Sequence, residues 1–374
     1  MFAISQPFGD SGVLWLLIEN GEGMIDIAHT ARKSFFALSR LTGMHHFAPA
    51  SLSGVGGILM LHRVSTQPRS PLGVNDHLSV TPYFLEKTII ALKRDGYEFI
   101  AMDNVPQAIG TERAKRFIAV TFDDGYLDNY QNAYPILRKH NIPYTVYIAP
   151  GLINGDVHLW WEIIEQVVAI RSDIVLPSRH GREHFECNTK AEKLATLRAL
   201  QNNIVHKMPE EQQATFIRDL AQLAGIDCVA HNSAELMNWN QVREIAKDPL
   251  CTIGAHTYSH FHLKKLSDDT IWKEIEQCQI ALDLETGMLP KHLAYPYGYA
   301  AAIGSREVAI AGAAGYKTGV TTRHGMLFSK HEYSPMALPR ISLNGRHQNV
   351  SDVRTMLAGL TGLLANGRKN VVTV

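Results

Sequence analysis

Short apolar runs alternate along the chain with longer segments in which apolar residues recur every three or four positions. Continuous apolar runs of four to eight residues are typical of buried strands, and the three-to-four spacing is typical of helices packed on a core. The runs predict strands at 57–61, 117–122, 144–148, 251–254, 293–295 and 317–321. The spacing predicts helices at 82–95, 128–140, 239–247, 268–284 and 306–314.

The repeated order of strand and helix predicts an α/β fold, with a mostly parallel sheet covered by helices. The pattern alone leaves open whether the sheet closes into a barrel. Segment 154–233 departs from the alternation and is dominated by helical runs, so it predicts a helical insertion that shapes a substrate groove above the sheet. We expect residues 1–50 to form an N-terminal helical extension, 51–350 the main domain, and 351–374 a C-terminal helix and tail.

The bulk composition disfavours several partners. Lysine plus arginine and aspartate plus glutamate both number 36, so no net field attracts nucleic acid. Four widely spaced cysteines without a C-x-x-C pair predict buried thiols. The apolar run 13–18 is too short to cross a bilayer and lacks a preceding basic region, so a cytoplasmic or membrane-peripheral location is favoured. The amphipathic segment 25–41 predicts a helix docked on the protein's own body, with peripheral membrane contact as the alternative.

Two adjacent carboxylates, Asp123 and Asp124, end the apolar run 117–122 and precede Gly125. Neighbouring acids at the end of a buried strand repel each other, so a cation normally neutralises one of them. A plain Asp-Asp-Gly turn is the alternative interpretation.

Two histidines, His256 and His260, stand four residues apart just after the run 251–254. Such a pair can bind one ion through two imidazole nitrogens, although a lone pair among 18 histidines is more often structural. Together with one of the aspartates it gives an Asp-His-His set that leaves positions open for water and substrate. Zn²⁺ is the default ion for these donors, and Ni²⁺, Co²⁺, Fe²⁺ or Mn²⁺ suit them as well.

A third strand end carries the sequence Ala294-Tyr295-Pro296-Tyr297-Gly298. The functional interpretation is that the backbone N–H of Tyr297 stabilises a developing oxyanion while its ring lines a pocket. The alternative is an ordinary turn.

The motifs T-F-D-D-G-Y, H-T-Y-S-H and A-Y-P-Y-G occur here in the order found in the polysaccharide deacetylase family, carbohydrate esterase family four, and the chain resembles that family over residues 57–343. The resemblance implies a distorted (β/α) barrel and a divalent metal held by Asp124, His256 and His260. It also implies that Asp123 is the general base of a metal-dependent hydrolase, which removes N-acetyl groups from an amino-sugar oligo- or polysaccharide and releases acetate.

The general acid is less plainly marked. The run 59–61 ends in His62-Arg63, which looks like the N-terminal Tyr-His-Arg segment of the circularly permuted poly-N-acetylglucosamine deacetylases, so His62 is assigned as the acid and His347 is the competitor. The family's third motif often begins with an arginine that tunes the base. Lys291-His292-Leu293 stands in its place, and Arg340 is the candidate substitute. Among the aromatic residues, Trp160 or Trp161 is the candidate for stacking on a sugar ring.

Two other functions fit the same sequence. An O-acetyl esterase acting on a glycan would share the metal and the base. A catalytically silent carbohydrate-binding protein would keep the fold, but it would have no need of a free carboxylate beside the metal.

Overall fold

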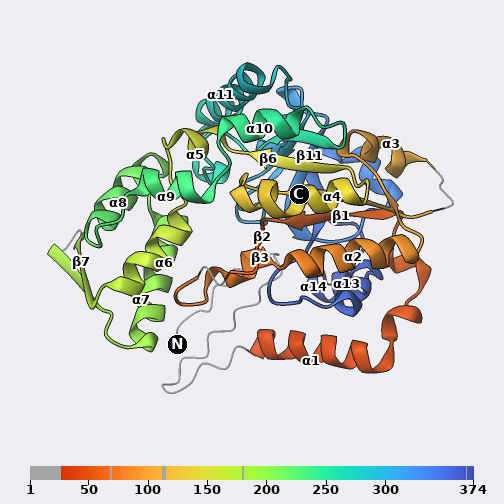
Figure 1. The fold of residues 1–374 in the computed structure, drawn as a ribbon, viewed down its shortest axis with the longest axis horizontal. Coiled ribbons are helices and arrows are strands. Elements are labelled where there is room, and N and C mark those ends of the chain that lie inside the picture. The colour runs from red at the N-terminus through yellow and green to blue at the C-terminus, as the bar shows by residue number, and fades with distance from the viewer. Residues whose placement is uncertain (1–26, 68–69, 112–114, 179–180, 368) are drawn as a thin grey trace, which may run out of the picture.

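The computed structural model describes residues 27–67, 70–111, 115–178, 181–367 and 369–374 (Figure 1). Its centre is a closed, all-parallel barrel of seven strands, and closure follows because the first strand pairs with both the last strand and β5. In order around the barrel, the strands are β1 (Gly56–Leu61), β12 (Leu338–Ser342), β11 (Thr318–His324), β10 (His292–Ala294), β9 (Cys251–Ala255), β6 (Tyr144–Ile148) and β5 (Phe117–Phe122). A two-residue strand, β4 (Glu98–Phe99), adds to β5 from outside. The predicted α/β fold is therefore confirmed, and the structure decides the open question in favour of a barrel.

Six of the seven barrel strands match predicted apolar runs to within three residues at each end. The predictions missed β12, in which Pro339 and Arg340 interrupt the apolar run. Arg340 is compatible with a strand here because its side chain faces the barrel interior, where the Asp123 carboxylate is its partner.

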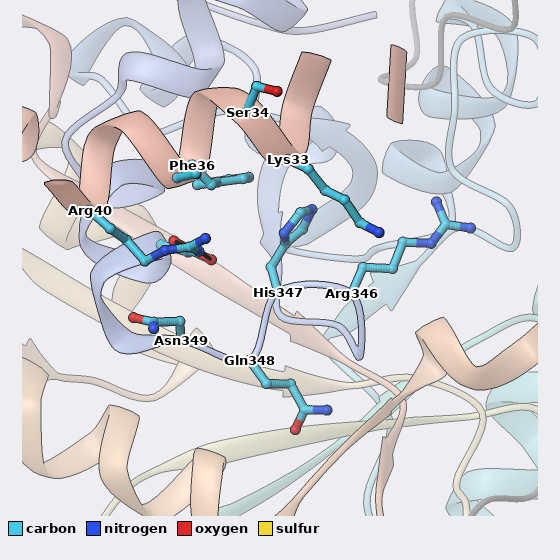
Figure 2. Close-up of a pocket in the computed structure, with 10 residues that line it drawn as sticks. Lys33, Ser34, Phe36, Arg40, Arg346, His347, Gln348 and Asn349 are labelled. Atoms are coloured by element: carbon cyan, nitrogen blue, oxygen red, sulfur yellow. Dashed lines mark hydrogen bonds and ion pairs between the residues drawn. The ribbon is translucent and has the colours of Figure 1, made fainter. Parts of the chain in front are cut away.

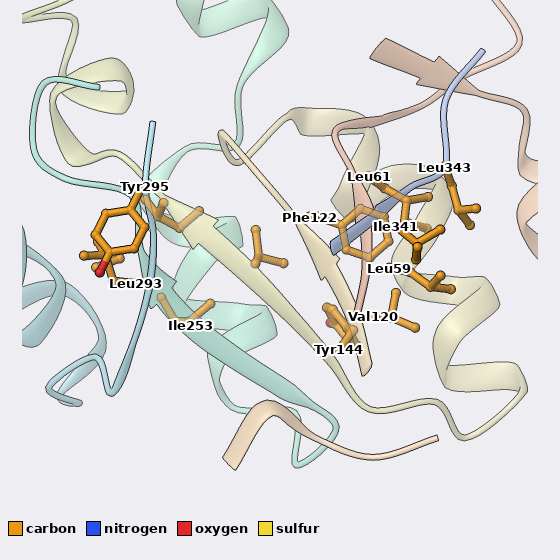
Figure 3. Packing of buried hydrophobic residues seen from close by; sticks show 14 of the residues in the cluster. Leu59, Leu61, Val120, Phe122, Tyr144, Ile253, Leu293, Tyr295, Ile341 and Leu343 are labelled. Atoms are coloured by element: carbon orange, nitrogen blue, oxygen red, sulfur yellow. The ribbon is translucent and has the colours of Figure 1, made fainter. Parts of the chain in front are cut away.

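The pleat of the strands separates two sets of buried side chains. Leu59, Leu61, Val120, Phe122 and Ile341 pack outward with the helices (Figure 3). Residues of the opposite parity, such as Ile58, Phe117, Ala119 and Leu338, form a second cluster that draws from β1, β5, β6, β10, β11 and β12. Because side chains alternate along a strand, Thr121, Asp123 and Arg340 continue this inward-facing set.

The five predicted helices surround the barrel close to their expected positions, together with a short helix at 105–110 that was not predicted. Thr81 caps α2 (Pro82–Arg94), and Ser267 caps α11 (Asp268–Thr286), which ends at Gly287 in the left-handed conformation. The other covering helices are α3 (Val105–Gly110), α4 (Tyr134–Lys139) with a π-helical turn before it at Asn129–Ala133, α10 (Trp239–Ala246) and α12 (Ser305–Ala313). All four cysteines are buried and none forms a disulfide.

The insertion between β6 and β9 has a hydrophobic core of its own. Its helices are α5 (Pro150–Asn154), α6 (Trp160–Ile170), α7 (Lys190–Asn202) with a π-helical continuation at Asn203–Lys207, α8 (Glu210–Gln222) and α9 (Cys228–Glu235). The predicted helical segment also contains two strands that were not expected, β7 (Asp173–Ser178) and β8 (Gly181–Glu186), which pair as an antiparallel hairpin. The sequence of β8 is mostly polar and exposed, so it carries no apolar signal for a strand.

The N-terminal helix α1 (Ile27–Thr42) packs against α13 (Val350–Leu357), as Figure 1 shows. Phe36 is buried, the Ser39 and Thr355 hydroxyls lie 2.7 Å apart, and Arg40 donates two hydrogen bonds to Asp352. These contacts agree with docking on the protein's own body, and no finding supports the membrane alternative. The predicted single C-terminal helix is replaced by α13 and the short α14 (Leu360–Ala365). In the described part of the chain, no helix is both long and apolar enough to span a bilayer.

Candidate active site

The candidate residues meet at the carboxyl-terminal end of the barrel. His62 follows β1, the aspartate pair follows β5, His256 and His260 follow β9, and Tyr297 comes shortly after β10. Parallel strands place all their carboxyl ends at the same rim, so residues up to 235 positions apart in the chain come together there. The structure therefore brings all six residues to one end of the fold.

Asp124, His256 and His260 form a compact, buried cluster. The Nε2 atoms of both histidines lie 3.4 Å from Oδ1 of Asp124, and the three ligand atoms are all within 4.8 Å of one another. Asp124 and His260 have φ angles of 73° and 54°, a region that side chains other than glycine rarely adopt. Such backbone strain, concentrated on two members of one cluster, is typical of a functional site.

The electrostatics of this cluster suit a bound cation. Burial would raise the pKa of Asp124, but the His256 contact and the nearby imidazoles hold it well below its ordinary value, so the carboxylate is charged. Burial lowers the pKa of His260 to about 4, which leaves the imidazole neutral. Burial opposes the charged form of His256 as well, but the two aspartates raise its pKa overall.

The donor set also fits a metal in its geometry. Nδ1 of His256 lies 2.7 Å from the carbonyl oxygen of Ala294, a contact that directs Nε2 toward Asp124. Asp124 Oδ1 is buried and accepts no well-aligned hydrogen bond from the described residues. One carboxylate oxygen and two imidazole nitrogens facing a common point are the ligands of an open hydrolytic metal site.

Asp123 forms a bidentate ion pair with Arg340, whose side chain lies inside the barrel. The guanidinium donates to Oδ1 at 2.8 Å and to Oδ2 at 2.7 Å, and it also reaches the Thr121 hydroxyl and the Thr321 carbonyl. Both partners of the ion pair are almost fully buried. Burial would raise the pKa of Asp123, but the Arg340 charge and hydrogen bonds outweigh it, so the carboxyl stays ionised. The structure thus places Arg340 against the candidate base, as the sequence suggested.

The structure separates the two candidates for the general acid. Nε2 of His62 lies 3.9 Å from Oδ2 of Asp123, and its side chain is 22% exposed, so solvent and substrate can reach it. His347 instead packs against Phe36 of α1, with the two rings tilted and their centroids 4.5 Å apart. The contacts therefore favour His62 as the residue beside the candidate base.

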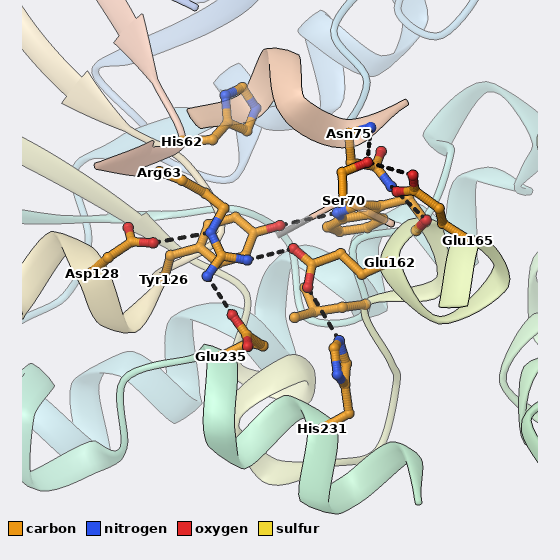
Figure 4. A network of polar contacts seen from close by, with 12 residues as sticks. His62, Arg63, Ser70, Asn75, Tyr126, Asp128, Glu162, Glu165, His231 and Glu235 are labelled. Carbon is orange, nitrogen blue, oxygen red and sulfur yellow. Dashed lines mark hydrogen bonds and ion pairs between the residues drawn. The ribbon is translucent and has the colours of Figure 1, made fainter. Parts of the chain in front are cut away.

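A buried arginine, Arg63, sits next to His62, and the sequence marks it only as the second member of the His62-Arg63 pair, with no role of its own. Arg63 donates to Asp128, Glu162 and Glu235, and its guanidinium lies 4.2 Å from the centre of the Tyr126 ring (Figure 4). Glu162 belongs to α6 and Glu235 to α9, so the network joins the insertion to the barrel. The sequence signal for Arg63 was the polar His-Arg pair between apolar residues 61 and 64.

Two tryptophans at the start of α6 donate hydrogen bonds to two different tyrosines near the site. Trp160 is buried and donates a hydrogen bond to the hydroxyl of Tyr297. Trp161 donates to the hydroxyl of Tyr126, and its ring centroid lies 5.1 Å from that of His260. Because Trp160 is only 6% exposed, Trp161 is the better candidate for contact with a sugar. Tyr297 has a φ of 63°, so it sits at a sharp backbone turn beside His260.

The family model described as polysaccharide deacetylase matches residues 110–218 and 227–319, more than half of the chain. The chain therefore belongs to the polysaccharide deacetylase family. The matched residues include the aspartate pair, both histidines of the metal cluster and Tyr297, whereas His62 and Arg340 lie outside them.

Curated relatives share shorter stretches. Bacillus subtilis (strain 168) YxkH, whose name assigns it provisionally to the polysaccharide deacetylases, is 27% identical over 167 residues, which are 43% of this chain and 54% of that protein. The poly-beta-1,6-N-acetyl-D-glucosamine N-deacetylase of Staphylococcus aureus (strain N315) is 30% identical over 106 residues, 28% of this chain and 33% of that one. The chain thus spans about half of the length of YxkH and about one third of the length of the Staphylococcus aureus enzyme.

Two solved structures resemble this chain over about four fifths of its length. The Streptococcus pyogenes deacetylase PplD in complex with acetate aligns with a TM-score of 0.54 at 20% identity, covering 80% of this chain and 97% of that one. IcaB from Ammonifex degensii aligns with a TM-score of 0.51 at 16% identity, covering 82% and 98%. At these identities the likeness establishes the shared fold, and it confirms the distorted barrel.

Proposed function

We propose that the protein is a metal-dependent N-deacetylase of an amino-sugar polysaccharide. One observation carries the proposal: a buried Asp-His-His cluster lies directly beside a second carboxylate that Arg340 holds ionised, with an accessible imidazole 3.9 Å from that carboxylate. A binding module has no use for such a free base. The name of the Staphylococcus aureus relative supports a poly-N-acetylglucosamine substrate.

Asp124, His256 and His260 would hold the metal, with Zn²⁺ as the default ion for this donor set. When bound, the ion supplies Lewis-acid polarisation of the acetyl carbonyl and lowers the pKa of the attacking water. The adjacent aspartates divide two tasks that one carboxylate cannot perform together. Asp124 is committed to the ion, and Asp123 stays free to accept a proton.

Asp123 acts as the general base and takes the proton of the attacking water. Arg340 uses one lone pair of each carboxylate oxygen, and the remaining lone pairs are open to water. His62 donates a proton from Nε2 to the departing amine, which an amide substrate requires because an amide anion is a very poor leaving group. The backbone N–H of Tyr297, at its sharp turn, helps stabilise the negative charge on the carbonyl oxygen.

The decisive experiment measures acetate release from N-acetylglucosamine oligomers by protein stripped of metal and then reloaded with each candidate ion. We expect activity only with metal, and none from Asp124→Asn under the same conditions. An O-acetylated glycan assayed in parallel separates amide from ester hydrolysis. Equal acetate release with and without metal, or release from the ester alone, would overturn the proposal.

A further inference from the structure

A cavity of about 680 Å³ opens between α1 and the segment that joins β12 to α13, apart from the candidate active site (Figure 2). Its volume is in the range of small-ligand sites. The lining is mostly polar or charged and comprises Lys33, Ser34, Phe36, Ala37, Arg40, Arg346, His347, Gln348, Asn349 and Asp352. None of these residues belongs to the metal cluster or its neighbours.

The charges around this cavity are unbalanced. Its lining has three permanent cations and a single carboxylate, Asp352, and Arg40 already neutralises that carboxylate through two 2.8 Å hydrogen bonds. Lys33 and Arg346 form no ion pair with any residue that the structure describes. Figure 2 shows both side chains on the same side of the cavity, next to His347. Both side chains are exposed, so within the described residues the cavity presents a lysine and an arginine that no carboxylate neutralises.

The cavity lies at the same end of the barrel as the candidate active site. Leu343, just after β12, donates its backbone N–H to Met60 of β1, and Gly345 donates to the carbonyl of His77. The segment after His77 forms β3 (Ser79–Val80), which pairs with β2 (Arg63–Val64) directly after His62. The segment 77–80 thus contacts both the loop that carries Arg346 and the strand that directly follows the candidate general acid.

We propose that this cavity binds a phosphate-type oxyanion, and that the anion is a phosphate or phosphodiester group on the glycan substrate. The assignment of the anion to the glycan substrate rests on the proposed function. Arginine presents a planar fork of donors that matches two oxygens of a phosphate, and lysine adds a point charge, so together they bind a doubly charged oxyanion. A neutral N-acetylated sugar has no negative group that would bind to two cations.

Isothermal titration calorimetry on metal-free protein tests the site, with N-acetylglucosamine 1-phosphate and inorganic phosphate as probes and N-acetylglucosamine as the uncharged control. Lys33→Gln/Arg346→Gln is the test variant. Lys190→Gln/Arg198→Gln, two exposed cations on α7, is the matched control. Asp124→Asn removes the phosphate binding that a metal centre would itself produce. Lys33→Arg/Arg346→Lys keeps the charge, and circular dichroism checks that every variant is folded.

We expect the phosphates to bind wild type, Asp124→Asn and the α7 variant with similar affinity. Affinity should fall about tenfold or more in Lys33→Gln/Arg346→Gln and be largely kept in the charge-conserving variant. Unchanged affinity in Lys33→Gln/Arg346→Gln, or loss of affinity in Asp124→Asn, would overturn the site.

The source of the anion is tested by the ratio of kcat/KM for a phosphate-bearing N-acetylglucosamine oligomer to that for the neutral oligomer. A fall of about tenfold in this ratio in Lys33→Gln/Arg346→Gln supports a phosphate on the glycan. If the ratio does not change although phosphate binding is lost, the ligand of the cavity is a free phosphate compound. That result would overturn the assignment of the anion to the glycan substrate. If no glycan is deacetylated but phosphate binding still depends on Lys33 and Arg346, the proposed function fails and the anion site stands.

Discussion

Replacing Arg340 with methionine should destabilise the protein far more than breaking an exposed ion pair of the same geometry. Arg340 and Asp123 form a bidentate pair in which the two side chains are 0% and 2% exposed. Removing one partner leaves the other as an uncompensated buried charge, at a cost of about 3–5 kcal/mol. Methionine replaces the aliphatic stem of the arginine, which limits the loss of packing, so the electrostatic effect is the larger part of the cost.

Arg354→Met is the matched control. Arg354 also forms a bidentate pair, with Asp95 at 2.7 and 2.9 Å, but its side chain is 33% exposed. Solvent screening reduces the value of such a pair to at most about 1 kcal/mol. Urea denaturation at neutral pH in the presence of a chelator measures both costs without a contribution from bound metal.

The double variant Asp123→Asn/Arg340→Met adds a second constraint. It removes both buried charges, so it should be more stable than Arg340→Met alone.

In Arg340→Met, burial is left as the main influence on Asp123, and the pKa of Asp123 should rise from its depressed value. The acid limb of the kcat/KM profile should then move to higher pH. If Arg340→Met costs no more than Arg354→Met, or if the acid limb stays where it is, the argument about this ion pair is wrong.

Three further predictions concern the other site residues and the pH dependence of stability. Asp123→Asn should keep its metal, measured by elemental analysis, while losing nearly all turnover, since Asp124 and the two histidines remain; loss of the ion would contradict the division of tasks. His62→Gln should reduce amide hydrolysis about 10²–10⁴-fold but affect an aryl acetate ester much less, because a good leaving group needs no proton, and His347→Gln should leave this selectivity unchanged. Burial lowers the pKa of His292 to about 4, so its folded-state pKa lies below the unfolded value of 6.5, and stability should fall as pH drops from about 6.5 to 4. This histidine should account for about 3 kcal/mol of that fall, and a denaturation series in which His292→Gln shows the same pH dependence as wild type would refute it.

Local sequence contained the main elements of the fold and the chemistry of the metal cluster. The apolar runs at 117–122 and 251–254 identified strands, and the carboxylates and imidazoles that follow them were recognisable as ligands because a strand end is a fixed position in a parallel sheet. The alternation of strand and helix likewise determined the α/β class.

Only the tertiary structure decided how distant segments meet. Barrel closure depends on the pairing of β1 with β5 and β12, and a pairing partner has no signature within the strand itself. Arg340 reaches Asp123 across 217 residues of sequence, and Arg63 gathers carboxylates from α6 and α9 of the insertion. The free energy of such ion pairs depends on burial and on the separation of the charges, and both are properties of the folded chain rather than of any segment of it.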